Sequence, residues 1–90
     1  MQSIIQTEKE CYLCGRKDSL HAHHCLHGVA NRKLADQDGL IVWLCVDCHT
    51  NLHQRGWHDR ELKQLAESVW IKHYGTEEEF RKRYGKSYQQ

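Results

Sequence analysis

Two C-x-x-C pairs constrain this sequence more than any other feature. Cys11 and Cys14 form the first pair and Cys45 and Cys48 the second, with thirty residues between the pairs. Two thiolates three positions apart can face one ion, so the pairs together predict a tetrahedral zinc site with four cysteine ligands. Gly15 permits the positive-φ backbone that such a turn often requires. The alternative is a redox C-x-x-C motif, but that motif is expected beside a βαβ unit, a pattern that this sequence does not have.

The length of the chain gives a reason for such a site. Ninety residues form one domain, and packing alone buries too little apolar surface to make it comfortably stable. The fifth cysteine, Cys25, fits a reducing compartment better than a secreted disulfide framework. Residues 1–10 do not form a signal peptide, and no apolar run is long enough to cross a membrane. We therefore expect a soluble, cytoplasmic protein.

Residue patterns predict the elements around the cysteines. Residues 20–26 roughly alternate between apolar and polar side chains, which favours a short strand. Residues 40–44 form a continuous apolar run, which indicates a buried strand leading into the second cysteine pair. Residues 28–39 show little apolar periodicity and are expected to form a loop, in which residues 30–34 could make a helical turn. A helix should begin near residue 46.

Two further helices are predicted towards the C-terminus. Asp59 is the expected N-cap of the first, which carries an apolar stripe with Trp70 beside it. The stripe consists of Leu62, Leu65, Ala66, Val69 and His73. Residues 76–79 have the form of a capping box for the second helix, with Phe80 and Tyr84 as its inward pair.

Three histidines are spaced so that they can bind a second cation. His23 lies in the first predicted strand, while His49 and His53 are four positions apart on one face of the predicted helix. Three nitrogen ligands leave positions free for water and substrate, as in catalytic metal sites. Alternation places His24 on the opposite face from His23, where its imidazole can serve as a general base. No role is assigned to the other histidines, which are His21, His27, His58 and His73.

The adjacent histidines, the cysteine pair that ends the second strand and the two helix histidines resemble the HNH endonuclease motif. The residues that carry this resemblance are His23, His24, Cys45, Cys48, His49 and His53. From residue 10 to residue 88 the chain is similar to small phage-encoded HNH proteins. The resemblance implies a small α+β fold: a ββα-metal (HNH) core with a four-cysteine zinc site, followed by two C-terminal helices. The single domain, residues 1–90, would comprise a flexible arm (1–9), a zinc-stapled core (10–56) and a helical extension (57–90).

The same resemblance implies a metal-dependent endonuclease that hydrolyses phosphodiester bonds in DNA. His24 matches the histidine that activates water. His23, His49 and His53 match the ligands of a single divalent cation, which would be Mg²⁺, Mn²⁺, Ni²⁺ or Zn²⁺. The protein would act inside the host cell of a phage or prophage, with a larger phage assembly as a further candidate partner.

Position 40 departs from the family pattern. The family has an asparagine nine residues before the first helix histidine, where it braces the loop of the general base, and this chain has Leu40. Asp38 or Asn31 could substitute, the loop could be braced in another way, or activity could be weakened. The departure keeps a second function open: a non-catalytic zinc-stapled module with a degenerate HNH site that binds nucleic acid or protein. His24 favours the enzyme, because a binding module has no use for a non-ligating histidine beside three ligands.

Basic residues near the predicted metal cluster are candidates for phosphate contacts, although each could equally be a solubilising surface charge. These candidates are Arg32, Lys33, Arg55 and Arg60. The formal net charge of +1 is only weak support for DNA or any other nucleic-acid partner, since a dedicated duplex binder usually carries an excess of basic residues. A second basic group near the C-terminus fits either a solvated helix end or a phosphate-contacting patch. It consists of Arg81, Lys82, Arg83 and Lys86.

Overall fold

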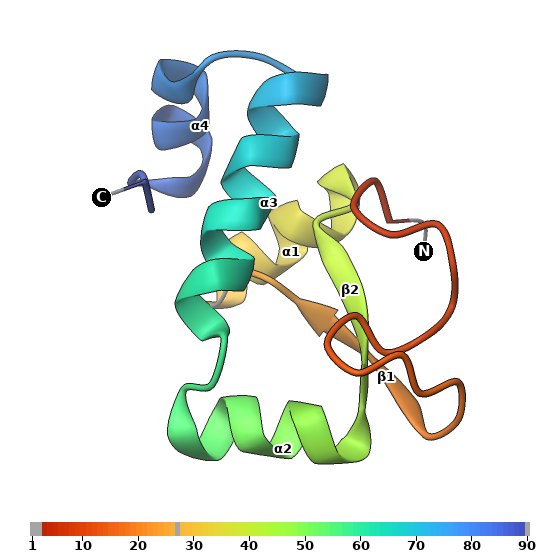
Figure 1. Ribbon diagram of the computed structural model, residues 1–90. Helices are drawn as coiled ribbons and strands as arrows, with labels where there is room; N and C mark the ends of the chain where they lie inside the picture. Colours follow the sequence, from red (N-terminus) through yellow and green to blue (C-terminus); the bar gives the residue numbers. More distant parts are fainter. Residues whose placement is uncertain (1–2, 27, 90) are drawn as a thin grey trace.

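The structure, a computed structural model, describes residues 3–26 and 28–89, so His27 lies outside the described residues. Within them the chain forms a small α+β domain with a two-stranded antiparallel sheet and four helices (Figure 1), which confirms the predicted fold class at this level. The elements in chain order are β1 (Leu20–His24), α1 (Val29–Asp38), β2 (Ile41–Cys45), α2 (Val46–Arg55), α3 (Asp59–His73) and α4 (Glu77–Tyr84).

The sheet aligns two segments that each carry one candidate ligand, since His23 lies in β1 and Cys45 ends β2. β1 and β2 pair in antiparallel register from Leu20 opposite Cys45 to His24 opposite Ile41. β2 is apolar and mostly buried, as its continuous apolar run predicts. β1 ends at His24, two residues earlier than predicted, and Cys25 is buried in the core just beyond it. Because β2 runs directly into α2, the sheet and this helix meet at one corner.

The prediction of a loop over residues 28–39 is wrong, because α1 fills this segment and extends beyond the helical turn suggested for residues 30–34. Only Ala35 and Asp38 of this helix are buried, so its apolar periodicity is weak even though it is helical. The segment is rich in good helix formers. Gly39 ends the helix in the left-handed region, at φ 77°, with its N–H bonded to the carbonyl of Ala35. α1 packs against β1 and therefore brings its side chains to that strand.

The predicted helix near residue 46 is confirmed as α2, and two helices follow it. α3 rises from the end of α2 past the sheet, and α4 lies beside α3 (Figure 1). The prediction of Asp59 as an N-cap is wrong: His58 is the cap residue, and the Asp59 carboxylate lies 2.9 Å from Lys63 Nζ. The capping box of α4 is confirmed, since the Glu79 N–H donates to Thr76 Oγ1 and the Glu79 carboxylate accepts from the Thr76 N–H.

The core lies between the sheet and the two C-terminal helices. Of the stripe predicted for α3, Leu62 and Ala66 are buried and Leu65 is half-buried, with Trp70 buried beside them. His73 is exposed, so its place in the stripe is wrong; it is the last residue of the helix and lies beyond the core. The inward pair predicted for α4 is buried: Phe80 and Tyr84.

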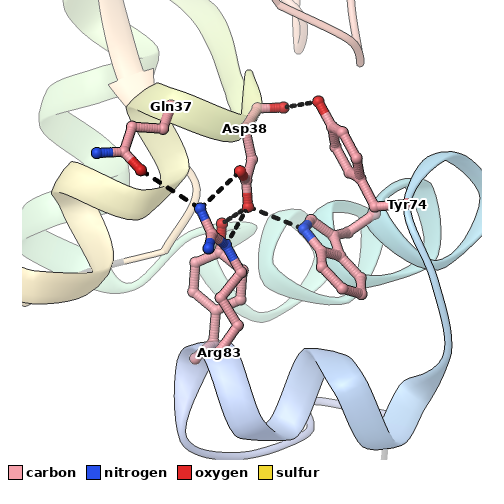
Figure 2. A network of polar contacts seen from close by, with 6 residues as sticks. Gln37, Asp38, Tyr74 and Arg83 are labelled. Atoms are coloured by element: carbon pink, nitrogen blue, oxygen red, sulfur yellow. Dashed lines mark hydrogen bonds and ion pairs between the residues drawn. The ribbon is translucent and has the colours of Figure 1, made fainter.

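Asp38, the last residue of α1, joins this helix to α3 and α4 (Figure 2). Its carboxylate accepts hydrogen bonds from Trp70 Nε1 at 2.8 Å, from the Tyr84 hydroxyl at 2.6 Å and from two Arg83 nitrogens at 2.7 and 2.8 Å. Burial raises the pKa of Asp38, but these hydrogen bonds outweigh it, and the pKa lies below its ordinary value. The ionised carboxylate therefore fixes α1 where it borders β1.

Asp38→Asn is expected to lower the free energy of unfolding by about 2 to 3 kcal/mol. An amide has one acceptor oxygen, and its NH2 group would face the donors of Arg83 and Trp70. Chemical denaturation of the zinc-loaded protein, followed by circular dichroism, measures the effect. Gln37→Ala is the matched control, because the exposed Gln37 side chain only accepts from Arg83 at 3.4 Å. An equal loss in both variants would contradict this role of the carboxylate.

The N-terminal segment runs along β2. The Ile4 N–H donates to the carbonyl of Gly39 at 2.9 Å, and the Gln6 side-chain oxygen accepts from the Trp43 N–H at 2.9 Å. These bonds place residues 3–6 on the outer edge of the strand that ends at the cysteines. Among the helices of the described residues, none combines the length and the apolarity needed to span a membrane.

Candidate metal centres

The four predicted zinc ligands lie together where β2 meets α2. Cys11 and Cys14 come from the segment before β1, Cys45 ends β2, and Cys48 lies in the first turn of α2. Their sulfur atoms all lie within 4.8 Å of one another, and those of Cys14 and Cys45 are 3.7 Å apart. Sulfur atoms about 2.3 Å from a tetrahedral zinc ion are about 3.8 Å apart, so the spacing fits. The cluster can hold a structural metal such as zinc.

Local backbone geometry holds the first cysteine pair against the sheet. Gly15 adopts φ 82°, as its place in the turn predicts, and its N–H donates to the carbonyl of Cys11 at 2.8 Å. The Tyr12 N–H donates to the carbonyl of Trp43 at 2.8 Å. This bond ties the turn to β2 and brings residues far apart in sequence to one cluster.

The electrostatics of the cysteine cluster favour a cation. Burial raises the pKa of the Cys11 thiol, but backbone hydrogen bonds, above all that of Cys45, outweigh burial and lower the pKa to about 6. Burial and the neighbouring sulfurs raise the pKa of Cys48 above its ordinary value. One thiolate is thus favoured near neutral pH, whereas four thiolates repel one another. A metal ion among the sulfurs compensates that repulsion.

Cys25 lies apart from this cluster. Its side chain is fully buried, and burial together with the charge of Asp59 raises the pKa of its thiol to about 12. The thiol is therefore protonated at neutral pH and acts as a small apolar core residue rather than as a nucleophile. All five cysteines are free, so no disulfide competes with the use of the other four as ligands.

The structure brings together the three histidines that the sequence assigns to one cation. His23 projects from β1, while His49 and His53 project from one face of α2. The Nε2 atoms of His49 and His53 are 3.0 Å apart, and the His23 ring centroid lies 5.3 Å from that of His49 and 5.8 Å from that of His53.

This arrangement fits a metal ion. One nitrogen from each ring lies within 4.8 Å of the other two, and ligands about 2.0 Å from a tetrahedral ion would be about 3.3 Å apart. His23 is buried, His49 is half-buried and His53 is exposed. The cluster is therefore fixed at the sheet and reaches solvent at the helix. This is the arrangement expected of a site that admits a substrate.

His21 is a residue that the sequence reasoning missed. Its Nδ1 lies 3.3 Å from Nδ1 of His49, on the side of that ring away from the His53 contact. A ligating histidine commonly hydrogen-bonds through its second ring nitrogen, which fixes its orientation. The signal was present in the sequence, because His21 and His23 are two positions apart in a strand and so share a face.

The histidine cluster lines a surface cavity of about 170 Å³. The residues around it are Ala22, His23, His24, Arg32, His49 and His53. His24 turns towards α1, where its Nε2 lies 3.3 Å from Asp36 Oδ1. A substrate group that enters the cavity would therefore meet the three candidate metal ligands, the His24 imidazole and the Arg32 guanidinium.

Leu40 does not reach this cavity. Its side chain is fully buried in the core, while its backbone carbonyl accepts from the Cys25 N–H at 3.1 Å. The chain directly after His24 is thus braced by a backbone bond. The two candidate substitutes for the family asparagine contact the C-terminal helices: Asn31 Nδ2 donates to the Tyr84 carbonyl at 3.4 Å, and Asp38 forms the network described above.

Leu40→Asn is expected to lower the free energy of unfolding by about 2 to 4 kcal/mol, because it places an amide in an apolar core. Leu40→Met conserves volume and should cost less than about 1.5 kcal/mol. Thermal unfolding of both variants in the zinc-loaded state tests this expectation. An asparagine variant as stable as the wild type would show that the position is closer to the cavity than to the core.

The predicted phosphate contacts lie at different distances from the cavity. Arg32 lines it, and a neighbouring hollow that shares His24 and Arg32 adds Lys33. Arg55 is exposed in the last turn of α2. Arg60 lines a separate hollow. Arg32 and Lys33 are therefore the candidates that the fold places beside the histidines.

Three of the basic residues near the C-terminus form ion pairs. Arg83 binds the Asp38 carboxylate, and its side chain is 33% exposed. The other two pairs lie along α4 at helical spacing and are Arg81 with Glu77 at 3.4 Å and Lys82 with Glu78 at 3.8 Å. These pairs favour the interpretation of this segment as a solvated helix end with one structural arginine.

Comparison of the chain with known protein families, curated proteins and solved structures found no match. The assignment of a function therefore depends on the residues and their geometry.

Proposed function

We propose that this chain is a metal-dependent DNA endonuclease of the HNH type. The observation that carries the proposal is the convergence of His23, His49 and His53 in a cavity whose walls also include His24 and Arg32. β1 supplies His23 and α2 supplies His49 and His53, while β2 pairs with β1 and leads directly into α2. These three elements, with α1 between the strands, support a ββα-metal arrangement. The four-cysteine set and the three-histidine set differ in ligand chemistry, which supports a structural role for one site and a catalytic role for the other.

The two clusters would perform different tasks. Four cysteines complete a tetrahedral zinc shell and leave no position for a substrate, so that site stabilises the fold. Three histidines provide neutral nitrogen donors and leave coordination positions open beside the cavity. The second cation would be divalent: Mg²⁺, Mn²⁺, Ni²⁺ or Zn²⁺.

The chain's own residues account for most of the hydrolytic step. Arg32 would hold the phosphate of the DNA backbone in the cavity by charge and hydrogen bonding. His24 would accept the proton of a water molecule as its oxygen attacks phosphorus, while the bond from phosphorus to the departing oxygen breaks. A bound divalent cation would supply positive charge that stabilises the phosphate and the departing oxygen.

Phosphate contacts should make DNA binding sensitive to salt. The double variant Arg32→Ala, Lys33→Ala should bind all duplex sequences more weakly and reduce the slope of log affinity against log salt by about 2. Fluorescence anisotropy with two unrelated labelled duplexes measures both effects. Lys82→Ala, in which an exposed α4 lysine is removed, is the control. A slope equal to that of the wild type would count against these two contacts.

Conversion of supercoiled plasmid by the zinc-loaded protein tests the proposed activity. Cleavage should require a divalent cation in addition to the zinc ion of the cysteine site and should be lost in His53→Ala. His73→Ala removes an exposed histidine at the end of α3 and should leave cleavage unchanged. Failure of the wild type to cleave with Mg²⁺, Mn²⁺, Ni²⁺ or Zn²⁺ would overturn the proposal.

The burial of Leu40 favours a second candidate function. An apolar core residue where the HNH family has its asparagine fits a zinc-stapled module that binds nucleic acid or protein without cleaving it. If this second function is the right one, the wild-type protein would be folded and bind DNA but would not convert the plasmid. His24 favours the enzyme, because it lies at the cavity without belonging to the three-histidine cluster.

A further inference from the structure

Asp36 is the acidic residue beside the candidate general base. Its Oδ1 lies 3.3 Å from His24 Nε2. The His24 side chain is 16% exposed and that of Asp36 is 48% exposed, so the contact lies at the edge of the cavity rather than in free solvent. Asp36 lines the neighbouring hollow, which shares His24 and Arg32 with the cavity.

The helix that carries Asp36 is held on several sides. Asp36 follows Arg32 by four positions in α1, so both side chains lie on the face of the helix that borders β1. Ala35 is buried, and Asp38, two residues after Asp36, bonds to α3 and α4. The backbone that carries the carboxylate is therefore fixed relative to the strand that carries His24.

The chemistry of the two side chains decides which nitrogen of His24 carries the proton. An ionised carboxylate only accepts hydrogen bonds, whereas a neutral imidazole has one N–H donor and one acceptor nitrogen. A bond between Asp36 and Nε2 therefore requires the proton to be on Nε2. Nδ1 is then the unprotonated nitrogen.

We propose that Asp36 is a positioning residue: by accepting the Nε2–H of His24, it holds this imidazole with Nδ1 available as the proton acceptor. The inference rests on the proposed nuclease function and specifies which atom of His24 takes the proton from water. Asp36 would also orient the ring of the base in a chain that has Leu40 in place of the family asparagine. Carboxylates orient catalytic histidines in this way in unrelated enzymes.

The test compares Asp36→Ala and Asp36→Asn with the wild type. Glu61→Gln is the matched control, because Glu61 Oε2 lies 3.1 Å from Nδ1 of His58 in a carboxylate–histidine pair that belongs to neither cluster. Long-range ¹H–¹⁵N spectra of the zinc-loaded protein, in slightly alkaline buffer, report the tautomer of His24 without any cleavage assay. Plasmid conversion then gives kcat and KM for each variant.

The wild type should show His24 mainly as the Nε2–H tautomer, and Asp36→Ala should shift it towards a mixture. kcat should fall about 10- to 100-fold in Asp36→Ala, with KM and cation affinity unchanged. Asp36→Asn should recover part of the loss, since its amide oxygen can accept the same bond. Glu61→Gln should match the wild type in both readouts.

Two results would overturn the inference. One is an Nδ1–H tautomer of His24 in the wild type. The other is wild-type kcat in Asp36→Ala when the wild type cleaves. If no protein cleaves, the proposed function fails, but the tautomer spectra still decide whether Asp36 sets the protonated nitrogen. Asp36 is exposed, and circular dichroism checks that each variant is folded.

Discussion

Cys45→Ser is expected to leave the chain unfolded at 25 °C. Cys45 links the end of β2 to the first cysteine pair, and its sulfur lies 3.7 Å from that of Cys14. Binding of structural zinc contributes about 10 to 16 kcal/mol in small zinc domains, which matches or exceeds the net stability of about 5 to 15 kcal/mol of a typical domain. Far-UV circular dichroism and the zinc content of the purified variant measure the loss.

Cys25→Ala provides the matched control for this prediction. Cys25 is buried but lies outside the four-cysteine cluster, so its removal should cost about 1 to 2 kcal/mol and leave zinc content unchanged. Removal of zinc from the wild type by a strong chelator should reproduce the unfolding seen in Cys45→Ser. A folded Cys45→Ser variant with wild-type thermal stability would show that the cluster does not staple the domain.

His24→Ala is expected to slow DNA cleavage by about 10²- to 10⁴-fold, which corresponds to a barrier increase of about 3 to 5 kcal/mol. His24 lines the cavity but is not one of the three clustered histidines, so cation affinity should be unchanged. Its side chain is mostly shielded yet lies at the end of β1, so the fold should survive. Single-turnover conversion of supercoiled plasmid measures the rate.

His58→Ala serves as the control for His24→Ala. His58 caps α3 and pairs with Glu61, and it belongs to neither metal cluster. Its loss should leave the cleavage rate within a factor of about two of the wild type, since surface substitutions have small effects. Cleavage by His24→Ala at the wild-type rate would remove His24 from the mechanism.

Much of the fold and of the candidate sites could be predicted from the spacing of residues close together in the sequence. A pair of cysteines three positions apart, or of histidines four positions apart on a helix, sets a distance that changes little with tertiary context. The cysteine pairs that begin at Cys11 and Cys45 follow this rule, as do His49 and His53. The capping box of α4 could be predicted for the same reason, because it depends on two residues within one turn.

Long-range contacts could not be predicted in the same way. α1 has a weak apolar pattern, and the bonds of Asp38 to residues more than thirty positions away help to hold it. Since a helix over the whole segment was not predicted, the sequence did not indicate that Arg32 and Asp36 would lie on the same face. The burial of Leu40 agrees with the apolar run over residues 40–44, but the hydrogen bond from the Cys25 N–H to its carbonyl could not be predicted from local spacing.

We propose that a closed cysteine site stabilises the fold and that an open histidine site performs the chemistry. One measurement tests both parts: plasmid conversion by the zinc-loaded protein after brief passage over a chelating resin, with circular dichroism and zinc content followed in parallel. We predict that cleavage disappears while the fold and one zinc ion per chain remain, and that added Mg²⁺, Mn²⁺ or Ni²⁺ restores it. Two tightly held zinc ions per chain with no cleavage under any cation, or cleavage lost only when the protein unfolds, would contradict the account.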